Sequence, residues 1–154
     1  MGLYEDLCMA NENVEIKETS HLPSFQPGCY MNGEIFIKNN ISDIRKAEVL
    51  FEELGHREKT YGNILDQTKW INRKFESYAV RHGYQAALPL RIIIEAYHYG
   101  ISNLYELAEY VELSEEYIIK VIDFYKKKYG LSTYFNGYVI KFEPLQVFEH
   151  HNWD

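Results

Sequence analysis

The segment SDIRKAEVLFEELGHR, residues 42–57, carries the strongest structural signal in the chain. Ser42 is a residue type that caps helices. The apolar residues behind it recur at the spacing of one buried helical stripe: Ala47, Leu50, Phe51 and Leu54. We therefore predict a helix from about Ser42 to Arg57 with one face in a hydrophobic core.

Within this helix, Glu52-Glu53-Leu54-Gly55-His56 has the spacing of the zincin motif HExxH. Residues at i and i+4 project from one helical face, so Glu52 and His56 can bind one metal ion while Glu53 acts as a general base. Glu52 stands where that motif has its first His, and a carboxylate makes the site richer in oxygen. Taken alone, the segment is weak evidence for a metal site, because acidic pairs followed by a His are common on solvated helix faces, where Glu52 would pair with His56.

A third ligand comes from the next predicted helix, about Asn72 to Leu88, which carries Glu76. Ala79 follows one turn later, and its small side chain allows two helix backbones to pack closely. Three protein ligands with one open position are typical of catalytic zinc, so we expect one zinc or another divalent ion. His21 could replace Glu52 as a ligand, but we favour the interpretation that it is an exposed loop residue. We interpret the other histidines as surface, core-edge or tail residues: His82, His98, His150 and His151.

The N-terminal third predicts a short helix near Leu3 to Ala10 and then a small antiparallel sheet. Alternating apolar and polar residues indicate a strand within residues 13–19. A loop with two prolines follows, and Asn32-Gly33 is the turn of a hairpin between residues 29–31 and 34–37.

The C-terminal part predicts three helices, about Leu90–Tyr99, Leu104–Val111 and Glu115–Tyr129, before an Asn136-Gly137 hairpin. Their order and length resemble a winged helix-turn-helix. The third helix, however, opens with Glu115-Glu116, where base contacts usually originate, and its lysines, residues 126–128, lie at the far end. We therefore favour a module that covers the catalytic domain or binds a protein over a DNA-binding one.

The composition also argues against a DNA-binding module, because a net charge of -7 opposes broad binding to phosphate groups. Fourteen tyrosines suit a protein-binding groove, although AT-rich codon usage explains them as well. The sequence has no leader-like start and no run of about 18 apolar residues. We therefore expect a cytoplasmic protein that is not inserted in a membrane. Cys8 and Cys29 form no CxxC pair or disulfide framework.

The chain resembles the ImmA/IrrE family of metallopeptidases from phages and mobile elements, loosely from Tyr4 to Phe148. The resemblance is carried by Lys46–His56, Tyr61-Gly62-Asn63-Ile64-Leu65-Asp66, Gly28-Cys29-Tyr30, Ile35-Phe36-Ile37, Glu76, Ala79 and Pro89.

This resemblance implies an α+β, minimal zincin-like domain in residues 1–89, with the small sheet packed on two site helices. A helical module with a hairpin would fill residues 90–148, and residues 149–154 would be a tail. It assigns His56 and Glu76 as ligands and Glu53 as the catalytic carboxylate, while Glu52 departs from the family. The implied function is a zinc-dependent endopeptidase that cleaves a helix-turn-helix repressor. A pseudo-peptidase that binds a repressor, or a DNA-binding regulator, are the alternatives.

Overall fold

The computed structural model describes residues 2–59 and 69–150, with the backbone alone at residue 59 and residues 69–76. Its contacts divide the chain into an N-terminal unit, residues 1–87, and a C-terminal unit, residues 88–154. Both units contain helices and a small sheet, so the predicted α+β class is confirmed. None of the described helices is long and apolar enough to cross a membrane.

The described part of the N-terminal unit contains α1 (Leu3–Ala10), β1 (Glu15–Thr19), β2 (Gly28–Met31), β3 (Glu34–Lys38), α2 (Asp43–Lys59) and α3 (Lys69–Ala87). The predicted helix near residues 3–10 and the strand near residues 13–19 are confirmed. α2 begins as predicted, because the Ser42 hydroxyl accepts a hydrogen bond from the Arg45 amide at 3.1 Å. The Tyr61–Asp66 segment of the family resemblance lies outside the described residues.

The sheet of this unit has the strand order β1-β3-β2. β2 and β3 form the predicted antiparallel hairpin, and Asn32 and Gly33 both have the positive φ angles, 54° and 80°, that a type I′ turn needs. β1 runs parallel to β3, with Ile16 opposite Ile35. The prediction of an antiparallel sheet was therefore wrong for β1. The loop of residues 20–27 leads from β1 to β2 at the opposite edge of the sheet. The hairpin turn then reverses the chain, so β3 lies between these two strands and runs in the same direction as β1.

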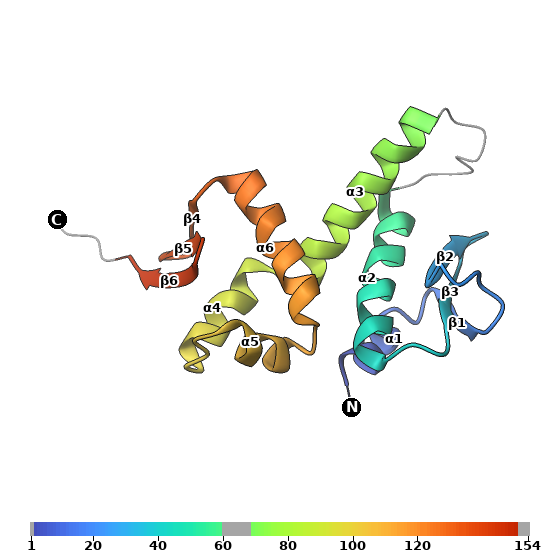
Figure 1. Ribbon diagram of the computed structural model, residues 1–154, viewed down its shortest axis with the longest axis horizontal. Coiled ribbons are helices and arrows are strands. Elements are labelled where there is room, and N and C mark those ends of the chain that lie inside the picture. Colours follow the sequence, from blue (N-terminus) through green and yellow to red (C-terminus); the bar gives the residue numbers. More distant parts are fainter. Residues whose placement is uncertain (1, 60–68, 151–154) are drawn as a thin grey trace. The chain divides into compact units, whose positions relative to one another are not determined.

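α2 lies between the sheet and α3 (Figure 1). Its inner face forms a core with the central strand, in which Ile35, Ile37, Ala47 and Leu50 are completely buried. We expected the sheet to pack on both site helices. Instead, α2 packs on the sheet, and α3 packs on α2.

The C-terminal unit contains α4 (Leu90–His98), α5 (Leu104–Val111), α6 (Glu115–Tyr129), β4 (Ser132–Phe135), β5 (Tyr138–Phe142) and β6 (Leu145–Glu149). All three helices lie within one residue of their predicted bounds. The Ser114 hydroxyl accepts a hydrogen bond from the Tyr117 amide at 3.1 Å and so starts α6. Asn136 and Gly137, with φ of 48° and 87°, form the predicted turn between β4 and β5.

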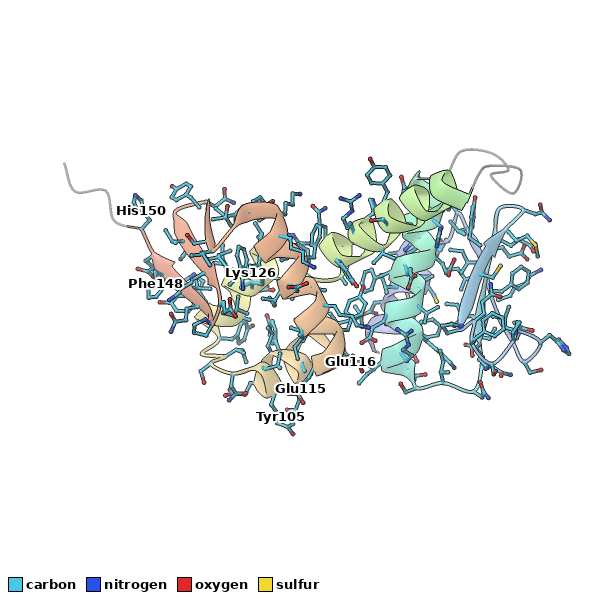
Figure 2. All side chains as sticks on the ribbon, turned by 45° about the horizontal axis from the view of Figure 1, so that its top comes forward. Tyr105, Glu115, Glu116, Lys126, Phe148 and His150 are labelled. Carbon is cyan, nitrogen blue, oxygen red and sulfur yellow. The ribbon has the colours of Figure 1, made fainter. Side chains whose placement is uncertain are left out.

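β6 was not predicted, so the expected hairpin is a three-stranded antiparallel sheet, β4-β5-β6. Pro144 stands directly before β6, and no Asn-Gly signal marks its turn. β6 reaches Glu149, and the His150 amide donates to the Gly137 carbonyl at 2.8 Å, so the sheet extends into the expected tail. Figure 2 labels Phe148 and His150 along this last strand and its end.

Tyr125 is the centre of the aromatic core of the C-terminal unit. Its side chain is 2% exposed, and its hydroxyl donates to the Leu88 carbonyl at 2.7 Å. Its ring stacks on Phe142 with centroids 5.8 Å apart, and Tyr129 stacks beside both. One side chain thus joins α6 to β5 and to the segment before α4.

Candidate functional site

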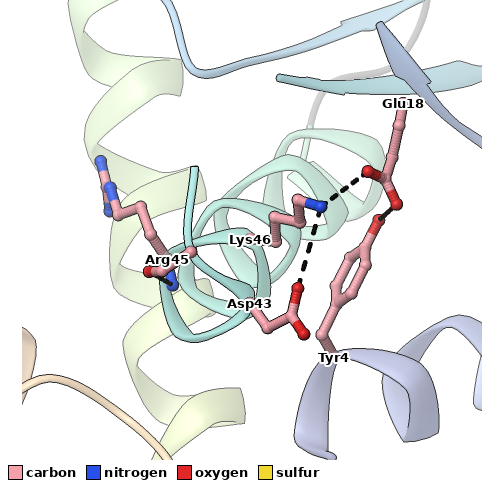
Figure 3. Close-up of polar contacts among 6 residues, drawn as sticks. Tyr4, Glu18, Asp43, Arg45 and Lys46 are labelled. Carbon is pink, nitrogen blue, oxygen red and sulfur yellow. Dashed lines mark hydrogen bonds and ion pairs between the residues drawn. The ribbon is translucent and has the colours of Figure 1, made fainter. Parts of the chain in front are cut away.

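A polar cluster fixes the first turns of α2 to α1 and β1 (Figure 3). The Lys46 ammonium donates to one carboxylate oxygen of Glu18 at 2.7 Å and lies 3.8 Å from the Asp43 carboxylate. The Tyr4 hydroxyl donates to the other oxygen of Glu18 at 3.2 Å. The Lys46 side chain is only 11% exposed, and a charge in such a position is costly without partners. This cluster therefore holds α2 in place two turns before Glu53.

Glu53 is a buried acidic residue of α2, 7% exposed, and it lies against the start of β2. A Cβ atom at Gly28 would stand 2.4 Å from Val49 Cγ1, 3.2 Å from Glu53 Cγ and 3.3 Å from Glu53 Oε1. Only glycine therefore permits this approach of β2. Val49 and Glu53 are one turn apart, so this face of α2 is directed at the strand.

Cys29, the next residue of β2, lies within electrostatic reach of the same carboxylate. Burial raises the pKa of the Cys29 thiol, and the negative charge of Glu53 raises that pKa further. A thiol with a raised pKa stays protonated at neutral pH and is a poor metal ligand. Cys8 and Cys29 are both free cysteines, and the geometry supports a packing role for Cys29.

α3 approaches α2 at two glycines. A Cβ atom at Gly55 would lie 2.2 Å from the Ala79 carbonyl oxygen. One at Gly83 would lie 3.1 Å from the Phe51 carbonyl oxygen and 3.3 Å from Glu52 Cα. The close packing expected at Ala79 is confirmed, with Gly55 as its partner on α2.

Glu52 and His56 are both partly buried on α2, and each has an interaction partner in the structure. Four residues advance a helix by about 400°, so the two side chains leave the axis about 40° apart. Glu53 is turned by about 100° from Glu52, toward β2. Glu76 belongs to α3, one turn before Ala79, but its side chain lies outside the described residues.

The donors assigned to a metal would be two carboxylates and one imidazole. Zn²⁺ and neighbouring divalent ions accept these nitrogen and oxygen donors, so the composition of the set fits such an ion. Among the side chains that the structure describes, no group of three or more His, Cys, Asp or Glu residues is arranged to hold a metal. Glu76 is not one of those side chains.

His82 of α3 has a feature that sequence reasoning missed. Its Nδ1 atom is buried and has no hydrogen-bond partner among the described residues. Buried ring nitrogens are normally paired with protein, water or an ion, so this atom marks His82 as a second polar position on α3. The available signal was its place one turn after Ala79 and beside Gly83, two α3 residues that lie against the α2 backbone.

The other histidines have structural surroundings of their own. His21 is exposed, and its amide donates to the Thr19 hydroxyl at 3.1 Å. His98 Nε2 lies 2.7 Å from the Tyr138 hydroxyl, and the His150 ring packs edge-on against Tyr134. His151 lies outside the described residues.

The lysines of α6 lie beside acidic or aromatic groups. Lys126 pairs with Glu143, Lys127 with Asp123 at 2.9 Å, and Lys120 with Glu116 at 3.8 Å. The Lys128 ammonium lies 5.2 Å from the centre of the Tyr129 ring. Figure 2 places Glu115 and Glu116 at the start of α6 and Lys126 farther along it. This charge pattern gives phosphate groups little to bind, in keeping with the preference for a protein partner.

No protein-family model matches this sequence, and no curated protein matches it.

Proposed function

We propose that this protein is a metal-dependent endopeptidase in which Glu52, His56 and Glu76 bind one zinc or similar divalent ion. Glu53 is its general base. The observation that carries this proposal is the buried Glu53 carboxylate, held against Gly28 at the start of β2.

β2 supplies a reason for a peptide to lie beside this carboxylate. It is an edge strand of the sheet that the structure describes. An extended peptide can add to such an edge through main-chain hydrogen bonds. A peptide bound there would pass next to Gly28 and therefore next to Glu53.

A divalent ion held by Glu52, His56 and Glu76 would polarise the scissile carbonyl and lower the pKa of water. The Glu53 carboxylate takes a proton from the attacking water and returns it to the leaving amine. Its packing against Gly28 restricts its orientation, so the carboxylate is held in position for both proton transfers. Glu52 adds a second negative charge one residue away, which favours a divalent cation at this end of α2.

The proposed substrate is a helix-turn-helix repressor of a phage or mobile element, which would place the enzyme in the cytoplasm. This substrate class comes from the family resemblance. A net charge of -7 supports it, because a repressor's DNA-binding surface is basic. The C-terminal unit would then bind the repressor or cover the catalytic unit.

A test combines metal analysis with cleavage of repressors encoded beside the gene. Protein purified without chelator should contain about one divalent ion per chain, and Glu53→Gln should keep that ion while cleavage falls by about 10²-fold or more. Glu58→Gln is the matched control, because Glu58 belongs to the same helix and its side chain is 57% exposed. The proposed enzymatic function would be refuted if the purified protein contained no metal and Glu53→Gln did not change the cleavage of repressors.

The second candidate is a pseudo-peptidase, and the replacement of His by Glu52 favours it. In that case the repressor would co-purify with the protein uncut, and Glu53→Gln would leave the complex unchanged. Zinc would be weakly held or missing in the same preparation. These outcomes distinguish a protein that only binds the repressor from an enzyme that cleaves it.

A further inference from the structure

The C-terminal unit contains an apolar pocket with a volume of about 690 Å³. Its floor comes from three helices through Ile93, Leu107 and Ile118, which are at most 4% exposed. Leu145 and Val147 of β6 form one wall, and the segment between α4 and α5 closes an end. All three helices and the last strand of this unit therefore contribute to the pocket.

Among the described residues that line the pocket, none is Asp, Glu, Lys, Arg, His or Cys. Its polar side chains belong to Tyr97, Ser102, Asn103 and Gln146. Ser102 and Asn103 already bond to Glu106, at 3.2 Å and 2.6 Å, as part of the cap of α5. Tyr97 and Gln146 are left to orient a ligand. An ionised ligand would lose its hydration here without gaining a counter-charge, so the lining selects uncharged molecules.

Size favours a small molecule over a protein segment. Pockets for single small molecules span about 300–1,000 Å³, and the observed volume lies inside this range. Three large apolar lining residues are strongly exposed, namely Tyr97 at 39%, Ile119 at 56% and Phe148 at 51%. They form the exposed rim of the pocket.

We propose that this pocket binds an uncharged, largely apolar small molecule, an aliphatic chain or aromatic ring system with a single polar group. Ile93, Leu107 and Ile118 receive its apolar body, and Gln146 or Tyr97 meets its polar end. This site is independent of the proposed peptidase, because every residue that lines it belongs to the C-terminal unit.

The full-length protein is titrated with N-phenyl-1-naphthylamine, a neutral probe whose fluorescence rises in apolar surroundings. Saturable binding of about one probe per chain is expected. The probe should be displaced by 1-decanol, and about tenfold less effectively by decanoate, which has the same chain length but carries a charge. No saturable binding, or equal displacement by the two competitors, would overturn the proposal.

Two variants locate the binding. Ala96 lines the floor and is 3% exposed, so Ala96→Phe should fill the pocket and abolish probe binding. Ile119→Glu places a charge at the exposed rim, where it cannot disturb the core, and should weaken binding about tenfold. Leu131→Glu is the matched control, because Leu131 is 68% exposed and does not line the pocket.

Unchanged binding in Ile119→Glu would place the probe elsewhere and refute the assignment. Sedimentation of the same variants tests whether a second copy covers the pocket. If the protein self-associates and Ile119→Glu abolishes association while probe binding is unchanged, the surface is a dimer interface and the small-molecule proposal fails.

Discussion

At the scale of single residues, Glu52 and Glu53 are neighbours with different surroundings. Glu53 is buried against Gly28, while Glu52 belongs to the side of α2 that approaches Gly83. The difference follows from helix geometry, because successive side chains are about 100° apart. Adjacent carboxylates can therefore serve separate roles, one as ligand and one as base. Glu52 is also the residue on which the choice between peptidase and pseudo-peptidase depends.

Restoring the usual donor at this position should strengthen metal binding. We expect Glu52→His to tighten zinc binding on the order of tenfold, because imidazole nitrogen is a better ligand for zinc than a carboxylate oxygen. Competition with a chromogenic chelator measures the affinity. Glu58→His adds an imidazole to the exposed side of α2 and should leave the affinity unchanged. Equal affinities in wild type and Glu52→His would show that Glu52 is not a ligand.

At the scale of elements, the packing of α3 on α2 determines where Glu76 can lie. Both close approaches use glycine, but they differ in how much space is left. A Cβ atom at Gly55 would overlap the Ala79 carbonyl oxygen at 2.2 Å, whereas one at Gly83 would stand 3.1 Å from the Phe51 carbonyl oxygen, a tight contact without overlap. The nearest atoms are backbone atoms at both positions and cannot turn aside as side chains do, so the shorter distance makes Gly55 the stricter requirement.

The two glycines therefore predict different outcomes for the same substitution. Gly→Ala within a helix gains about 1 kcal/mol of helix propensity. At Gly83 this gain should offset the mild crowding and leave stability nearly unchanged. Gly55→Ala should destabilise by about 1–3 kcal/mol, because α3 must move away from α2. Urea unfolding followed by circular dichroism gives both values. Equal effects would contradict the helix contact at Ala79.

At the scale of the whole molecule, each unit contains a buried tyrosine whose pKa is raised. Tyr4 in the N-terminal unit is 9% exposed, and Tyr125 in the C-terminal unit is 2% exposed. Burial raises the pKa of both phenols, with further increases from Cys8 and Glu18 at Tyr4 and from Tyr129 at Tyr125. A phenol that stays protonated in the folded state contributes stability that is full below its unfolded pKa, about 10. This contribution is lost as pH rises above that value.

Tyr125→Phe should separate this effect in the C-terminal unit. At neutral pH the variant should lose about 1–2 kcal/mol, because the Leu88 carbonyl loses its donor. Above pH 10 its stability should fall less steeply than that of the wild type, by up to about 1.4 kcal/mol per pH unit. Tyr4→Phe should act likewise on the N-terminal unit. Unfolding between pH 7 and 11 measures both, and parallel pH curves for variant and wild type would refute this role.

Local features were predictable from sequence because they depend on residues close together in the chain. Ser42 and Ser114 cap their helices, and both Asn-Gly pairs take the positive φ angles of tight turns. The helical spacing of Glu52 and His56 follows from the same local geometry. Each of these interactions spans four residues or fewer, so it does not depend on how distant parts of the chain fold.

The contacts between segments that are distant in the sequence were decided by the tertiary structure alone. It set the parallel pairing of β1, the sixth strand and the approach of Gly28 to Glu53, and it formed the apolar pocket. It also paired Lys126 with Glu143, which gives a lysine of α6 an acidic partner from beyond the helix. Each depends on which surfaces meet once the chain is folded. Sequence spacing does not predict these tertiary contacts, because the paths of the loops and the packing of the core determine which residues become partners.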